Sequence, residues 1–158
     1  MLFTTIIEIL LTLLVVFCVY GFYRSWKTGT APEYALFVAG SAPAILPAEG
    51  LWKGSVPELG KISWQGKKFL PGNRGINLFE KSGTTSEAYP FAFLITDSIG
   101  FPGKKILKLD YRQKENPWWL QFITDEMVST GSDKFLGIVY ITLIPGTPFR
   151  MGYFRLEK

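Results

Sequence analysis

Side chains that could perform chemistry are few and scattered in this sequence. It contains no histidine, so the usual general base, the usual zinc ligand and every Ser-His or Cys-His nucleophile pair are absent. Cys18 is the single cysteine, so an intrachain disulfide and a thiolate metal site are excluded. It lies in an apolar segment. An enzyme would need carboxylates, Tyr or Lys, and the acidic candidates are Asp97, Asp110 and Glu126. No metal and no cofactor is therefore predicted.

The acidic side chains are not spaced like a catalytic couple. Asp125 and Glu126 are adjacent, but neighbouring residues of a strand face opposite sides of a sheet and cannot easily act on one substrate. Asp110 alternates with Lys108 and Arg112, which favours outward charge pairs. We therefore name no catalytic residue and keep an enzyme as the third hypothesis.

Residues 2–23 form an almost unbroken apolar run that predicts a transmembrane helix, so we assign residues 1–23 to a membrane anchor. As a helix, this run of about 22 residues would reach about 33 Å, enough to cross a hydrocarbon core of about 30 Å. Aromatic residues gather at its C-terminal end, and Arg24 and Lys27 follow. The positive-inside rule then predicts a single-pass protein whose C-terminal domain is cytoplasmic. A cleaved signal peptide is the alternative, and it would need a basic N-terminal region and a small-residue cleavage site.

Glu8 is the one charged residue inside this run. An acid at mid-bilayer costs about 2.5–3.5 kcal/mol on insertion scales. Glu8 either reaches the interface beside Thr4 and Thr5 or meets a polar partner on a neighbouring helix. The residues that we predict to contact the membrane or a partner protein are Glu8, Trp26, Trp118 and Trp119.

Residues 24–49 read as a juxtamembrane linker that contains a short helix over residues 32–39. Thr30 and Glu33 have the spacing of a capping box, and Pro32 suits the first helical turn. The helix is too apolar for a free linker, so we expect it to lie on the bilayer or to cover the domain.

From residue 50 to residue 158, short apolar runs alternate with turn residues. This pattern predicts a mainly β domain, an antiparallel meander of about eight strands closed into a barrel. The expected strands are 51–56, 62–69, 76–80, 89–96, 105–112, 118–128, 135–144 and 149–156. The run 135–144 is apolar on both faces, and Trp118 and Trp119 should point to opposite faces. A linker helix, lipid or another protein must therefore cover the outside of the barrel there.

Several short motifs follow one another along the chain in an order that resembles a known family. They are Gly50-Leu51-Trp52-Lys53-Gly54, Trp64-Gln65-Gly66-Lys67-Lys68-Phe69, Asp125, Leu136-Gly137 and Gly152-Tyr153-Phe154-Arg155-Leu156. This set resembles the bacterial GXWXG family, and Gly50-x-Trp52 with Asp110-Tyr111 looks like the lipocalin signatures, although Leu109 stands where lipocalins have Thr. The resemblance implies a lipocalin-like (calycin) barrel that cups a hydrophobic ligand. It supplies no function for the GXWXG family itself.

The first functional hypothesis is a membrane-anchored, non-enzymatic barrel that holds a lipid or another lipophilic small molecule at the membrane surface. Its motivation is the barrel pattern together with 13 Phe, 7 Tyr and 5 Trp. The ligand-binding candidates are Trp52, Trp64, Phe79, Phe91, Phe93 and Tyr111. The plain alternative is that such rings fill the barrel, with Trp52 and Trp64 as core residues.

The second hypothesis is an accessory subunit of a larger membrane complex, which would dock through the transmembrane helix and the exposed aromatic residues. The bilayer is the partner common to both hypotheses. The basic residues are scattered rather than clustered, so nucleic acid is not predicted as a partner, and a mildly basic domain suits an anionic membrane surface.

Overall fold

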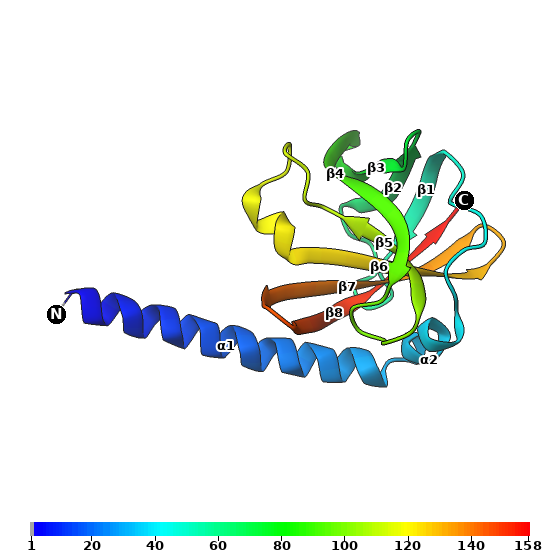
Figure 1. Cartoon of the computed structure of the whole chain (residues 1–158). Helices are drawn as coiled ribbons and strands as arrows, with labels where there is room; N and C mark the ends of the chain where they lie inside the picture. The colour runs from blue at the N-terminus through cyan, green and yellow to red at the C-terminus, as the bar shows by residue number, and fades with distance from the viewer. Residues whose placement is uncertain (1) are drawn as a thin grey trace.

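A computed structural model describes residues 2–158 as two helices followed by a closed antiparallel barrel. Figure 1 shows the barrel beside one long helix, with a short helix at its end. The predicted fold class is confirmed, because the described chain forms eight strands in sequential order around the barrel. The strands are β1 Gly50–Ser55, β2 Trp64–Leu70, β3 Arg74–Lys81, β4 Thr84–Asp97, β5 Lys105–Asp110, β6 Ile123–Gly131, β7 Lys134–Ile144 and β8 Thr147–Glu157.

Alternate connections of this meander lie at the same end of the barrel. One end carries the β1–β2 loop, the β3–β4 turn, the segment between β5 and β6, and the β7–β8 turn, and we term it the mouth. The long helix extends past the mouth toward its own N-terminus (Figure 1). The β3–β4 turn is tight because Ser82 and Gly83 both adopt positive φ, 52° and 78°, as in the turns that match strand twist.

The expected strand at 118–128 was wrong over its first part. Trp118–Phe122 form a 3₁₀ helix, η1, and β6 begins at Ile123. Pro117 precedes η1 and has no N–H for a sheet ladder, while its carbonyl accepts the Leu120 N–H at 3.0 Å. Leu120 is buried, whereas Trp118 is 74 % exposed. The two tryptophans therefore do not alternate across a sheet but lie on a short helix at the mouth.

The N-terminal helix, α1, spans Leu2–Thr30 without a break and so passes through the expected anchor boundary at residue 23. The capping box is not formed, because the Thr30 hydroxyl donates to the Lys27 carbonyl and Ala31 is the N-cap of the next helix. Within the described residues, one segment, Phe3–Thr30, is long and apolar enough to cross a membrane.

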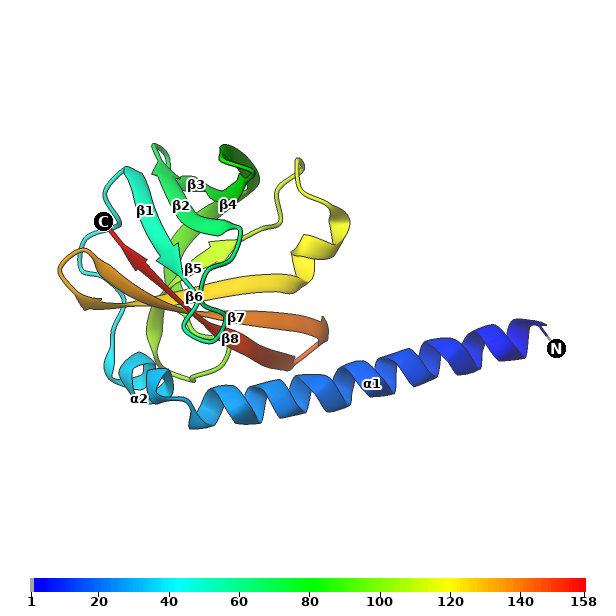
Figure 2. The ribbon, with the colours of Figure 1, turned by 180° about the vertical axis from the view of Figure 1, so that it is seen from behind.

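The second half of α1 packs along a free edge of β8. The β1 strand pairs with β8 only at residues 155–157, so the first part of β8 has no strand on that side. There the Arg150 N–H donates to the Ser25 hydroxyl at 2.9 Å, and Arg24 Nε donates to the Met151 carbonyl at 2.9 Å. Gly21 lets the helix approach, since a Cβ at this position would lie 2.6 Å from the Phe149 ring. Helix α1 and the β7–β8 hairpin lie side by side in both views (Figure 2).

The short helix α2, Pro32–Ala39, has the predicted bounds. Its Phe37 is fully buried in a cluster on the outer side of the barrel. The buried members of that cluster are Phe37, Ile106, Val128, Leu136, Ile138, Tyr140 and Tyr153. The linker helix therefore covers the outer side of β7 at Leu136, Ile138 and Tyr140, whereas Leu143 further along the strand stays 45 % exposed.

Candidate ligand-binding site at the barrel mouth

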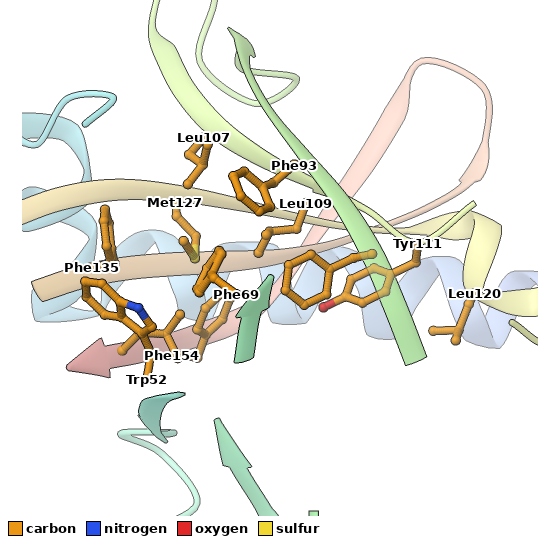
Figure 3. Packing of buried hydrophobic residues seen from close by; sticks show 12 residues of the cluster. Trp52, Phe69, Phe93, Leu107, Leu109, Tyr111, Leu120, Met127, Phe135 and Phe154 are labelled. Atoms are coloured by element: carbon orange, nitrogen blue, oxygen red, sulfur yellow. The ribbon is translucent and has the colours of Figure 1, made fainter. Parts of the chain in front are cut away.

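The barrel interior away from the mouth is filled with side chains. The Trp52 ring lies 5.0 Å from Phe135 and 6.0 Å from Phe69, and Phe69 lies 5.1 Å from Phe93. The Trp52 indole donates to the Ala48 carbonyl at 2.9 Å. Figure 3 shows this cluster extending from Trp52 and Phe135 at one end to Tyr111 and Leu120 at the other.

The structure places the six predicted ligand-binding residues in different surroundings. Trp52, Phe91 and Phe93 are buried in the ring cluster, the role of the plain alternative. Trp64 and Tyr111 line a pocket nearer the mouth. Phe79 is half-buried, and its ring lies 5.6 Å from that of Tyr89.

A buried ion pair forms the floor of that pocket. Lys67 Nζ lies 2.9 Å from Asp125 Oδ2, and the two side chains are 3 % and 5 % exposed. Nζ also donates to Asn77 Oδ1 at 2.8 Å and to the Tyr111 hydroxyl at 2.6 Å. The Tyr111 hydroxyl donates to Asp125 Oδ2 at 2.7 Å. We term these four residues the Lys67 cluster.

Burial and charge act in opposite directions on this cluster. Burial lowers the pKa of the Lys67 ammonium, and the Asp125 carboxylate opposes that shift. Burial, reinforced by Asp125, raises the pKa of the Tyr111 phenol well above its usual range, so the phenol keeps its proton. The rings of Trp64, Phe91, Tyr111 and Phe154 lie 5.1–5.4 Å from Nζ and favour the charged amine.

Sequence reasoning did not single out Lys67, which a β-bulge brings together with Trp64. The β2–β3 register shifts between Trp64 and Gly66, and Gly66 has a φ of +135°. The bulge puts Trp64 and Lys67, three residues apart, on the same pocket, whereas strict alternation places them on opposite faces. A glycine between an aromatic residue and a lysine in a strand was the available signal.

The pocket above the Lys67 cluster has a volume of about 170 Å³. It is lined by Trp64, Lys67, Asn77, Tyr111, Asp125, Val139 and Phe154. A second hollow, which we term the mouth cleft, has a volume of about 420 Å³ and is lined by apolar and aromatic residues. It is lined by Phe17, Trp118, Trp119, Phe122, Ile123, Ile141 and Leu143.

The mouth cleft and the pocket above the Lys67 cluster lie next to each other along strands β6 and β7. Ile123 and Asp125 are two apart on β6 and share a face. Their partners on β7 are Ile141 and Val139, which line the cleft and the pocket respectively. An apolar opening therefore gives way, one step deeper along the strands, to a polar floor.

The acidic candidates for catalysis do not come together. Asp110 pairs with Arg112 at 2.6 Å and Asp97 with Lys105 at 2.9 Å, both at the surface, as the alternation of Asp110 indicated. Glu126 faces away from Asp125 and accepts the Ser98 hydroxyl at 2.5 Å, which confirms the opposite faces of the adjacent acids. Residues 2–158 contain no group of acidic or cysteine side chains arranged to hold a metal ion.

The remaining predicted contact residues lie on α1 and η1. Glu8 is exposed on α1, and Trp26, 66 % exposed, packs against Tyr23 with ring centroids 6.3 Å apart. Trp118 and Trp119 are exposed and line the mouth cleft, and Trp119 also contacts the Tyr89 ring.

Comparisons with known proteins establish the fold alone. No family model matches the chain, and no curated protein sequence matches it. A solved structure, described as the crystal structure of a protein from Thermomonospora curvata, is similar with a TM-score of 0.59 and 17 % identity. The match covers 78 % of this chain and 83 % of that one. The GXWXG and lipocalin resemblance thus stays an expectation, while the closed antiparallel barrel preceded by an apolar helix is established.

Proposed function

We propose that this chain is a membrane-anchored, non-enzymatic barrel that binds a lipophilic molecule from the bilayer at its mouth. The observation that carries the proposal is the mouth cleft, a hollow of about 420 Å³ whose lining is entirely apolar or aromatic. Ligand pockets of small molecules are typically clefts of this size with mainly hydrophobic walls.

The position of the cleft relative to α1 supports a ligand that comes from the membrane. Phe17 lines the cleft and belongs to the uncharged part of α1, which runs between Glu8 and Arg24. Phe17 lies seven positions before Arg24, about 10 Å along a helix. With Arg24 at the headgroups, the cleft would lie at the depth of the upper acyl chains, where the exposed ring of Trp118 is also favourable.

The ligand would then enter without crossing water. Arg24 and Lys27 both pair with Glu58 of the β1–β2 loop, at 2.7 and 3.7 Å, so the basic end of the anchor is attached to the mouth. The same two basic residues support a cytoplasmic location of the barrel.

Native mass spectrometry of the full chain, purified from membranes in a mild detergent, tests the proposal. We expect a stoichiometric lipophilic adduct on the wild type and its loss from Leu143→Glu, which puts a charge in the cleft. Leu94→Glu is the matched control, because Leu94 and Leu143 are strand leucines with exposures of 47 % and 45 % and only Leu143 lines the cleft. Absence of an adduct on the wild type, or equal retention by both variants, would refute the proposal.

Glu8 favours a second candidate, the accessory subunit. It is an exposed acid on the segment of α1 that would lie in lipid, and such groups commonly meet a polar partner. Purification from native membrane should then recover a stoichiometric companion that is lost on Glu8→Leu. A single monodisperse species from that membrane contradicts this candidate.

A further inference from the structure

We infer that the molecule bound at the mouth is a lipophilic alcohol or phenol whose hydroxyl donates a hydrogen bond to Asp125 Oδ1. This inference rests on the proposed function and adds the chemistry of the ligand's polar end. It follows from which hydrogen-bonding groups of the Lys67 cluster are already occupied.

Every donor of the cluster is used within the protein. The three N–H groups of the Lys67 ammonium go to Asn77 Oδ1, the Tyr111 hydroxyl and Asp125 Oδ2. The Asn77 amide donates to the Tyr89 carbonyl at 3.0 Å and to the Tyr111 hydroxyl at 3.3 Å. The Tyr111 proton goes to Asp125 Oδ2.

The one remaining donor on the pocket wall is also occupied. The Trp64 indole N–H donates to Asn77 Oδ1 at 3.1 Å. The pocket thus has no side-chain donor left for a carboxylate or a phosphate among the residues that line it.

One acceptor of the cluster is still available. Asp125 Oδ2 accepts both Lys67 and Tyr111, while no described residue donates to Oδ1. Within residues 2–158, the fully buried side-chain atoms without a partner are Asn116 Oδ1 and Tyr140 Oη, so Asp125 Oδ1 retains accessible surface. Asp125 lines the pocket, which is therefore where Oδ1 can meet a ligand.

The charge balance of the site favours a neutral ligand group as the donor to Asp125 Oδ1. Lys67 already neutralises Asp125, so an ammonium ligand would add an unbalanced positive charge in a desolvated site. A neutral hydroxyl adds none and satisfies Oδ1. Its apolar body would extend past Val139 and Ile141 into the mouth cleft, along the face that these β7 residues share.

Three ω-brominated probes of equal chain length test the inference on the full chain in detergent: 10-bromodecanol, 10-bromodecanoate and 1-bromodecane. With the polar end at Asp125, the bromine lies in the cleft and quenches Trp118 and Trp119. We expect the alcohol to bind at least about tenfold more tightly than either other probe, because the free energy of a hydrogen bond to a charged group corresponds to an affinity difference of that size.

Asp125→Asn provides the internal control. Its amide oxygen can keep Lys67 and Tyr111, while its NH₂ replaces Oδ1 toward the pocket. The ratio of alcohol to carboxylate affinity should therefore fall at least about tenfold relative to the wild type, and dividing the two ratios cancels partition into micelles. Circular dichroism checks that the variant is folded; if it is not, the three probes on the wild type decide.

The outcomes separate the two proposals. Quenching by all three probes with equal affinity, or an unchanged ratio in folded Asp125→Asn, overturns the inference and leaves binding at the mouth intact. Quenching by none of them overturns the proposed function and the inference together.

Discussion

Breaking the Lys67–Asp125 pair on one side should be far more damaging than removing both charges. Asp125→Leu leaves the Lys67 ammonium, 3 % exposed, without a counter-charge and takes one acceptor from Tyr111. Removing one partner of a buried pair typically costs about 3–5 kcal/mol. We therefore expect a loss of about 3–5 kcal/mol.

The double variant Lys67→Met/Asp125→Leu should recover much of that loss. Apolar replacement of both partners removes the charges together, although Asn77 and Tyr111 still lose hydrogen bonds worth about 1 kcal/mol each. Lys67→Met alone leaves the Asp125 carboxylate unpaired and should cost a similar amount, so the coupling free energy between the two sites should be about 4 kcal/mol or more. Urea unfolding of the full chain in a mild detergent, followed by near-ultraviolet circular dichroism of the buried aromatic rings, measures it.

The chain contains a matched control for this cycle. Lys105 and Asp97 are also 2.9 Å apart, but their side chains are 63 % and 64 % exposed. The same two substitutions there should couple by no more than about 1 kcal/mol. If the Lys67 and Asp125 variants prove additive, or if the two pairs couple equally, burial is not what makes the Lys67 cluster strong.

Three further predictions concern the packing around the barrel. Gly21→Val should displace α1 from β8, because the valine Cβ would lie 2.6 Å from the Phe149 ring. The rate of hydrogen exchange at the Arg150 N–H, which donates to Ser25, should then rise, and unchanged protection would contradict the docking of α1 on β8. Phe37→Ala should lower the free energy of unfolding by about 3–5 kcal/mol, since Phe37 is fully buried. Leu36→Ala should lower it much less in the same urea unfolding assay, because Leu36 is 52 % exposed. Burial raises the pKa of Glu126 above 4.5, so the folded state holds this proton more tightly and its contribution to stability falls as pH rises above that value. Glu126→Gln should therefore gain stability relative to the wild type as pH rises above 4.5, and parallel stability curves would exclude this role for Glu126.

Alternation and turn residues were sufficient to predict most of the barrel. The strand at 105–110, for example, buries Leu107 and Leu109 while Lys108 and Asp110 stay less buried, a pattern visible in the sequence. Alternation fails where the backbone departs from regular geometry. Trp118–Phe122 follow Pro117 as a 3₁₀ helix where a strand was expected, and the bulge at Gly66 puts Trp64 and Lys67 on the same pocket.

The candidate site was harder to predict than the fold because its residues are distant in the sequence. Lys67 and Asp125 are 58 residues apart, and α1 meets β8 through contacts between Ser25 and Arg150 that are 125 residues apart. No local pattern encodes such pairings. The aromatic candidates were therefore chosen by type, and type alone does not separate rings that fill the core, such as Phe93, from rings that line a pocket, such as Trp64.

The docking of α1 on the barrel and its contribution to the mouth cleft have one structural cause. The β1 strand ends at Ser55, which leaves the first part of β8 without a strand neighbour. An exposed sheet edge is a site for unwanted pairing, and α1 covers it by supplying Arg24 and Ser25 to the backbone of β8. The helix that closes this edge is the same helix that contributes Phe17 to the mouth cleft. Because this apolar helix replaces the missing strand contact of β8, it also lies beside the mouth of the barrel and forms part of the mouth cleft.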